Sequence, residues 1–218
     1  MKKILTLIFG LICLAHTATA NAKSATTFVN TLIDDVIKDV LTADVSKEEK
    51  TKRFEDYMLN AVDTQAIAKA VLAQYWRTAS PKERDDFIEA FKDMAIKMTA
   101  ERFNMYNGQE VQFFSERPAQ GKNQVFVDST VTQDSKPIQV VWRVREKDGE
   151  YRIIDIIVEG VSITLNYRNE YTSYLQNHSI QDLIEELKLQ AKRASESSNE
   201  KDAKPAEKKE VKKEAKTK

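Results

Sequence analysis

Apolar residues recur every three or four positions through residues 26–106, a spacing typical of amphipathic helices. Ser46 and Ser80 are each followed three residues later by glutamate, which is the pattern of a capping box at a helix start. Asn107 and Gly108 are suited to end the last helix of this region. Four helices are therefore expected, over residues 26–41, 47–61, 64–77 and 81–106.

From residue 110 the apolar period shortens to two, and β-branched and aromatic residues become common, as in β-strands. Short connections between these segments predict an antiparallel meander. The last segment is apolar on both faces except at Asp155, so it should lie centrally or be covered on both sides. Four strands are expected, over residues 110–116, 124–133, 137–147 and 150–158, followed by helices over 162–177 and from residue 179 onward.

Both ends of the chain differ in composition from this α+β region. Two lysines, an apolar run of about twelve residues and a small-residue site ending at Ala20 predict a cleavable signal peptide over residues 1–20. The apolar run is shorter than the about twenty residues that span a membrane. From residue 191 the chain is a low-complexity Lys/Glu sequence, which predicts a disordered tail over 191–218. One folded domain is expected over residues 21–190.

Residue types that usually carry catalysis or bind metal are scarce. Cys13 is the only cysteine and lies in the predicted signal peptide, and His178 is the only histidine after it. No catalytic site, metal site or cofactor is therefore expected. Residues 21–190 carry 22 Lys/Arg against 28 Asp/Glu, which argues against nucleic acid as a partner.

Asp155 leaves two interpretations open. A carboxylate in an apolar strand can have a shifted pKa and serve in acid–base chemistry, here with Tyr151 or Tyr171. Alternatively, it accepts structural hydrogen bonds from a neighbouring helix, from Tyr151 or from Arg152. A third class of protein, an envelope interaction protein without a small ligand, is also compatible with the apolar pattern.

The expected helices carry more apolar surface than a small four-stranded sheet needs, which suggests a cavity. Met94, Met98 and Met105 would be flexible liners for a variable apolar ligand, although the same spacing is also that of an ordinary core.

Two segments carry a family resemblance. Residues 71–91 read VLAQYWRTASPKERDDFIEAF, and residues 158–171 read VEGVSITLNYRNEY. Both resemble, in the same order and spacing, the MlaC-type periplasmic phospholipid carriers, also called the toluene-tolerance or ABC-transporter auxiliary family. The likeness covers about residues 24–190.

This resemblance implies an NTF2-like α+β domain, with a helical N-terminal half packed on a four-stranded antiparallel sheet, two C-terminal helices and an internal lipid pocket. It implies a phospholipid, or another two-tailed lipid such as a hopanoid, as ligand. It also implies a periplasmic shuttle between an outer-membrane lipoprotein/porin complex and an inner-membrane ABC transporter complex with an MCE-domain subunit, which maintains outer-membrane lipid asymmetry. A monomer is expected.

Such a carrier must shield the acyl chains of its lipid from water. Two sixteen-carbon chains expose about thirty CH₂ groups, each costing about 0.8 kcal/mol in water. If the pocket lies between the apolar sheet face and the covering helices, ten residues are expected to contact lipid: Tyr75, Phe91, Met94, Met98, Val140, Trp142, Ile154, Ile156, Val161 and Tyr171.

Overall fold

The computed structural model describes residues 24–133 and 136–196. The predicted signal peptide, and the predicted tail beyond residue 196, lie outside these residues. Along the chain the elements are α1 (Ala25–Val36), the π-helical turn η1 (Ile37–Leu41), α2 (Lys47–Ala61), α3 (Thr64–Leu72), α4 (Tyr75–Thr78), α5 (Pro81–Ala100), the 3₁₀ turn η2 (Phe103–Met105), β1 (Glu110–Pro118), β2 (Gln124–Gln133), β3 (Lys136–Lys147), β4 (Glu150–Val158), β5 (Val161–Ser162), α6 (Ile163–Tyr174) and a last helix over residues 180–196.

The strands form one antiparallel sheet in the order β1-β2-β3-β4-β5. The expected combination of helices with an antiparallel meander is confirmed. The expected number of four strands is wrong, because β5 pairs with the end of β4 through Val158↔Val161 and Ile157↔Ser162. Two residues are too few to show an alternating pattern, so this strand could not be predicted from the sequence. The NTF2-like assignment remains a prediction.

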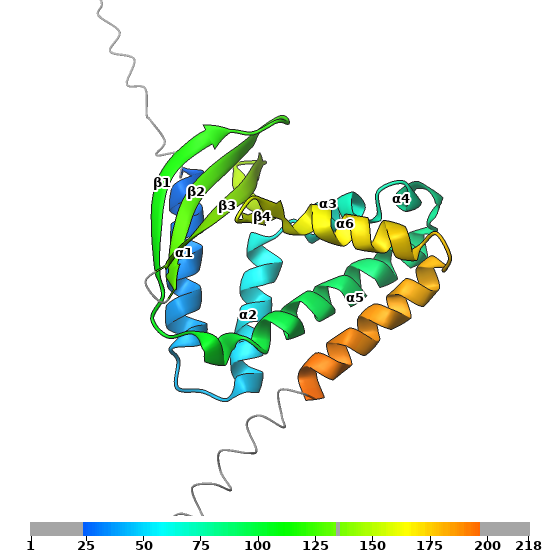
Figure 1. The fold of residues 1–218 in the computed structure, drawn as a ribbon, viewed down its shortest axis with the longest axis horizontal. Coiled ribbons are helices and arrows are strands. Elements are labelled where there is room, and N and C mark those ends of the chain that lie inside the picture. Colours follow the sequence, from blue (N-terminus) through cyan, green and yellow to red (C-terminus); the bar gives the residue numbers. More distant parts are fainter. Residues whose placement is uncertain (1–23, 134–135, 197–218) are drawn as a thin grey trace, which may run out of the picture.

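One face of the sheet is covered by α1 (Figure 1). Val29 on α1 is fully buried in a cluster with Val127 and Val144 of β2 and β3. Trp142 is partly buried in the same cluster, where its indole N–H donates to Ser129 Oγ at 3.0 Å. Part of the apolar sheet face that was expected to line a lipid pocket therefore packs against α1.

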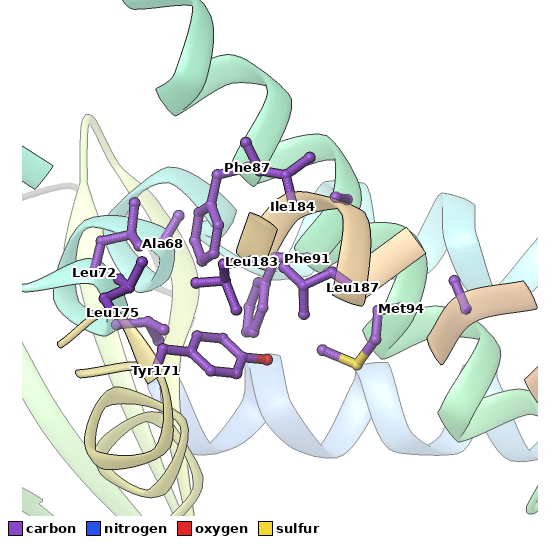
Figure 2. Close-up of a cluster of buried hydrophobic side chains, with 13 residues drawn as sticks. Ala68, Leu72, Phe87, Phe91, Met94, Tyr171, Leu175, Leu183, Ile184 and Leu187 are labelled. Atoms are coloured by element: carbon purple, nitrogen blue, oxygen red, sulfur yellow. The ribbon is translucent and has the colours of Figure 1, made fainter. Parts of the chain in front are cut away.

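The largest buried cluster lies beyond β4, between α3, α5, α6 and the last helix (Figures 1 and 2). Leu72, Phe87, Tyr171 and Leu187 are almost fully buried there. The last helix continues this packing past the domain boundary drawn at residue 190, since Ala191 is only 1% exposed. Ordered, packed structure thus extends to residue 196.

The serine caps position the helices as expected. Helix α2 begins and ends at the predicted residues, and Ser46 Oγ accepts a hydrogen bond from the Glu49 N–H at 3.3 Å. Helix α5 begins at Pro81 with a complete capping box between Ser80 and Glu83. A proline at the first helical position loses no hydrogen bond, because that N–H has no partner within the helix.

Two predicted helices in the first half of the chain stop early, and the helix predicted over 162–177 ends at Tyr174. The third helix stops at Leu72 because Ala73 has a φ of 51°, a left-handed conformation that interrupts the helix before α4. The fourth stops at Ala100 and tightens into η2, which buries Phe103 edge-on against Phe54 with ring centroids 5.4 Å apart. In both places tertiary packing overrides a continuous helical period.

A candidate apolar binding pocket

An apolar cavity of about 250 Å³ lies between α2, α3, α5, α6 and β4. Met58 and Val62 line it from α2 and its C-terminal end, and Ile67 lines it from α3. A parallel bridge between Val62 and Ile153 holds the junction of α2 and α3 against β4. The Asp63 N–H, which donates to Ile153 O at 3.0 Å, reinforces this contact.

Helix α5 supplies the longest wall of the cavity. Phe91, Ala95, Met98 and Arg102 follow one another at intervals of four, three and four residues, so they share one helix face. Phe91 is buried, Ala95 and Met98 are half-buried, and Arg102 is exposed just past the helix end. The wall therefore runs from an aromatic ring inside the protein to a cation at its surface.

Strand β4 lines the cavity in a pattern that a regular strand does not give. Arg143 of β3 pairs with Asp155, but the next residue, Val144, pairs with Ile153. Ile154 is thus the extra residue of a β-bulge, which breaks the alternation of side chains along the strand. Ile153, Asp155 and Ile156 all line the cavity, while Ile154 does not.

Asp155 fixes the start of α6 to the sheet. Its Oδ1 accepts hydrogen bonds from the N–H groups of Ile156 and Thr164 at 2.9 and 3.0 Å, and its Oδ2 accepts from Ser162 Oγ at 2.6 Å. Ser162 Oγ in turn accepts from the Leu165 N–H at 3.0 Å and caps the helix. Both carboxylate oxygens are therefore engaged in holding the α6 wall of the cavity.

The hydrogen bond from the Thr164 N–H of α6 confirms the structural interpretation of Asp155. The tyrosine partners of the catalytic one lie elsewhere: Tyr151 packs against Phe28 of α1, with ring centroids 6.1 Å apart, and the buried Tyr171 oxygen has no hydrogen-bond partner in the part of the chain that the structure describes.

An aromatic cluster separates the cavity from the helical core. Phe91 and Tyr167 line the cavity and meet edge-to-face at 5.4 Å. Tyr171 lies behind them, 5.6 Å from the Tyr167 ring and 6.2 Å from Phe87, among the leucines shown in Figure 2. Burial raises the pKa of both tyrosines, so both rings are neutral at physiological pH.

Replacing Tyr171 with phenylalanine is expected to raise the free energy of unfolding by about 1 kcal/mol. A buried hydroxyl without a partner costs about 1–3 kcal/mol, and phenylalanine keeps the ring contacts while removing this oxygen. Urea denaturation of lipid-stripped protein measures the change, with Tyr167→Phe as the comparison at the cavity wall. A loss of stability in Tyr171→Phe would show that the hydroxyl makes a bond, and so would contradict this assignment to the core.

Three of the ten predicted lipid contacts line the cavity, namely Phe91, Met98 and Ile156. The other seven occupy the helical core, the sheet or the surface: Met94 and Tyr171 in the core with Tyr75 packed on it, Val140 and Trp142 in the sheet, Ile154 at the bulge, and Val161, which is 60% exposed. Contact with lipid stays a prediction for all ten.

Residues that the sequence reasoning missed come mostly from α5 and α6. Ala95 and Arg102 extend the Phe91 and Met98 face at the same helical spacing, so continuing that face along the helix would have found them. Ile163 and Tyr167 lie four residues apart at the start of α6. Both residues lie in the first turns of the helix after its cap, Ser162, and the sequence did indicate that a helix begins there.

Neither a metal site nor a membrane-crossing helix emerges from the described part of the chain. Within residues 24–133 and 136–196, no three His, Cys, Asp or Glu side chains gather closely enough to hold a metal ion. No helix over these same residues combines the length and the apolar character needed to cross a bilayer.

Comparison with known proteins decides the family. The sequence model of the family described as MlaC protein matches residues 27–189. This chain belongs to the MlaC family. That match covers most of the folded domain, including every element that lines the cavity, and it confirms the resemblance seen in the two sequence segments.

Relatives of this MlaC-family chain are distant in sequence. The intermembrane phospholipid transport system binding protein MlaC of Haemophilus influenzae is 22% identical over 166 residues, which cover 70% of this chain and 78% of that protein. The toluene tolerance protein ttg2D of Pseudomonas putida is 26% identical over 119 residues, 54% of this chain and 55% of the other.

A solved structure shares the fold. The phospholipid-binding protein from Ralstonia solanacearum, determined in complex with a phospholipid, superimposes with a TM-score of 0.70 over 79% of this chain and 99% of that one. The two sequences are 20% identical. This likeness shows that the mixed helical and antiparallel architecture described above is shared by a protein solved with a bound lipid.

Proposed function

We propose that this chain is a lipid carrier that holds the acyl chains of a phospholipid in the apolar cavity. The observation that carries the proposal is the α5 wall, which leads from the buried Phe91 to the exposed Arg102. Apolar side chains line the inner part of the cavity, and a cation lies where the phosphate of a lipid would emerge. This order of groups matches the order of groups in a phospholipid.

Arg102 is the cation that we assign to the phosphate. The other cation on the cavity wall, Lys92, already pairs with Glu55 of α2 at 3.2 Å. A phosphate left near the surface stays hydrated, which avoids the large free-energy cost of burying an unpaired charge. A planar guanidinium also donates two parallel hydrogen bonds to a phosphate, which an ammonium does not.

Room for the acyl chains requires the walls to separate. The cavity of about 250 Å³ is smaller than the about 300–1,000 Å³ of typical small-molecule sites. Met58 and Met98 face it with flexible thioether chains that can take other rotamers. We therefore infer that side chains on α2 and α5 move aside as the chains enter.

Compartment and partners are part of the same proposal. The Haemophilus relative is named for intermembrane phospholipid transport, and the Ralstonia protein was solved with a phospholipid; both support a lipid ligand here. We propose a periplasmic carrier between an outer-membrane complex and an inner-membrane ABC transporter, following the predicted signal peptide. Such a carrier would help to maintain outer-membrane lipid asymmetry.

Native mass spectrometry of protein purified from bacteria that express the full chain tests lipid binding. The expected result is a protein species with added mass equal to one two-tailed lipid, identified as a phospholipid after extraction. Reloading stripped protein with a mixture of phosphatidylglycerol and diacylglycerol tests the role of the phosphate. Phosphatidylglycerol should be retained in preference, because diacylglycerol has the same chains but no anionic phosphate for Arg102.

A ligand-free species under conditions that preserve apolar complexes would contradict the proposal and would favour an envelope interaction protein. Equal retention of both lipids would keep the acyl-chain site but remove the assignment of Arg102.

A further inference from the structure

A second concave surface runs along the side of α3 that faces away from the apolar cavity. We call it the cationic groove; it encloses about 990 Å³ between α3, α4, the start of α5, the end of β3 and α6. Ile67 of α3 lines the apolar cavity, whereas Ala66, Lys69, Ala70 and Ala73 line the groove. The two sites therefore share a helix but use different faces of it.

The groove concentrates positive charge on an otherwise acidic domain. Its only acidic residue, Asp63, is already engaged: it pairs with an arginine, and its Oδ1 accepts from the Ala66 N–H at 2.9 Å to cap α3. The excess of Asp and Glu over residues 21–190 makes this local excess of cations stand out. The six cations that line the groove are Lys69, Arg77, Arg84, Arg145, Lys147 and Arg168.

Two of these cations have roles within the protein. Arg145 is the partner of Asp63. Arg84 donates to the carbonyl oxygen of Trp76 at 2.9 Å and lies 5.3 Å from the centre of its ring. The remaining four cations are exposed: Lys69, Arg77, Lys147 and Arg168. Asp63 is the one carboxylate among the residues that line the groove, and it already pairs with Arg145.

We propose that the cationic groove docks an acidic segment of a partner protein. The nine residues of α3 give the groove a length of about 14 Å, at about 1.5 Å per residue. Cations lie at both ends, with Lys147 at the β3 end and Arg77 at the α4 end, so carboxylates spread along a chain segment can each meet one. A single anionic headgroup would reach only one end.

Shape favours a peptide over a bilayer surface. Three of the residues that line the groove along α3 have small side chains, Ala66, Ala70 and Ala73, which allow a backbone to approach closely. A flat bilayer would not follow a concave surface of this kind. Trp76, half-buried at the α4 end, offers the kind of aromatic contact that often dominates protein interfaces.

Because α3 separates the groove from the cavity, the partner segment and a lipid can occupy the protein together. The docking proposal therefore does not depend on the proposed lipid function, and the two can be tested in the same preparation.

A fluorescein-labelled peptide of alternating glutamate and alanine serves as the probe, and its glutamine counterpart is the neutral control. Fluorescence anisotropy with the full chain should show binding of the acidic peptide only, weakening as salt is raised. The double variant Lys69→Gln/Lys147→Gln is expected to bind about tenfold more weakly. Lys52→Gln/Lys122→Gln removes two exposed lysines elsewhere and should change the affinity by less than about twofold.

Equal losses in the two double variants would show non-specific attraction and would overturn the proposal. The proposal would also be overturned if Lys69 and Lys147 were needed for binding to vesicles of phosphatidylcholine and phosphatidylglycerol but not for binding to the peptide. Lipid occupancy, measured in parallel by native mass spectrometry, reports separately on the apolar cavity. All four lysines are exposed, so loss of folding does not confuse the comparison.

Discussion

Replacing Ala95 with tryptophan is expected to abolish co-purification of lipid while the protein stays folded. Ala95 is half-buried on the cavity wall formed by α5, between Phe91 and Met98. An indole at this position would occupy much of the 250 Å³ cavity that the acyl chains need. Because the added side chain would extend into a cavity instead of a packed core, it should cost less than the about 1–3 kcal/mol typical of overpacking. Native mass spectrometry of the purified variant measures the remaining lipid.

Ala70→Trp is the matched control for this substitution. Ala70 is an exposed residue of α3 that lines the cationic groove, so the same change is made in a helix without filling the cavity. Both variants lose the same intrinsic helix propensity, about 0.5 kcal/mol. The Ala70 variant should keep its lipid. Normal lipid content in Ala95→Trp would show that the acyl chains lie elsewhere in the protein.

Local signals in the sequence predicted the elements that build the cavity. The two Ser-x-x-Glu caps located the starts of α2 and α5, because each satisfies backbone groups within a few residues of itself. The change of period after residue 110 located the first four strands of the meander. Such features depend on neighbours in sequence, so they can be recognised without knowledge of the fold.

Features that depend on distant contacts were missed. The left-handed conformation at residue 73 is adopted by an alanine, whereas glycine or asparagine is the usual sequence signal for it. The turn that follows is held by Arg84, eleven residues later, which donates hydrogen bonds to the carbonyl oxygens of Trp76 and Arg77. The bulge at Ile154 arises from pairing with β3 and changes which residues of β4 face the cavity. The bulge explains why Ile154, a predicted lining residue, does not line the cavity.

The predicted sheet face is shared between a helix and the cavity. Val140 and Trp142 alternate as residues of an apolar face should, and that face is covered as expected. Periodicity does not say what covers a face, however, and here α1 packs on the part that includes Trp142 and Val144. The cavity lies farther along the same face, where α2 and α3 meet β4 at the bridge between Val62 and Ile153.

Replacing Asp155 with alanine is expected to lower the free energy of unfolding by about 3 kcal/mol. The carboxylate accepts three hydrogen bonds, and its removal leaves the Thr164 N–H at the start of α6 without its partner. Hydrogen bonds to a charged group contribute about 1.5–3 kcal/mol, and a buried donor left unpaired costs about 1–3 kcal/mol. Urea denaturation at neutral pH measures the loss.

Asp155→Asn separates hydrogen bonding from charge. Asparagine keeps a carbonyl oxygen for the N–H groups of Ile156 and Thr164, and the Ser162 hydroxyl can rotate to accept from the new amide. Its expected cost is about 1 kcal/mol. Hydrogen exchange in the first turn of α6 should rise strongly in the alanine variant and little in the asparagine one. Equal losses in the two variants would mean that the negative charge itself, rather than this set of bonds, holds the α6 wall against β4.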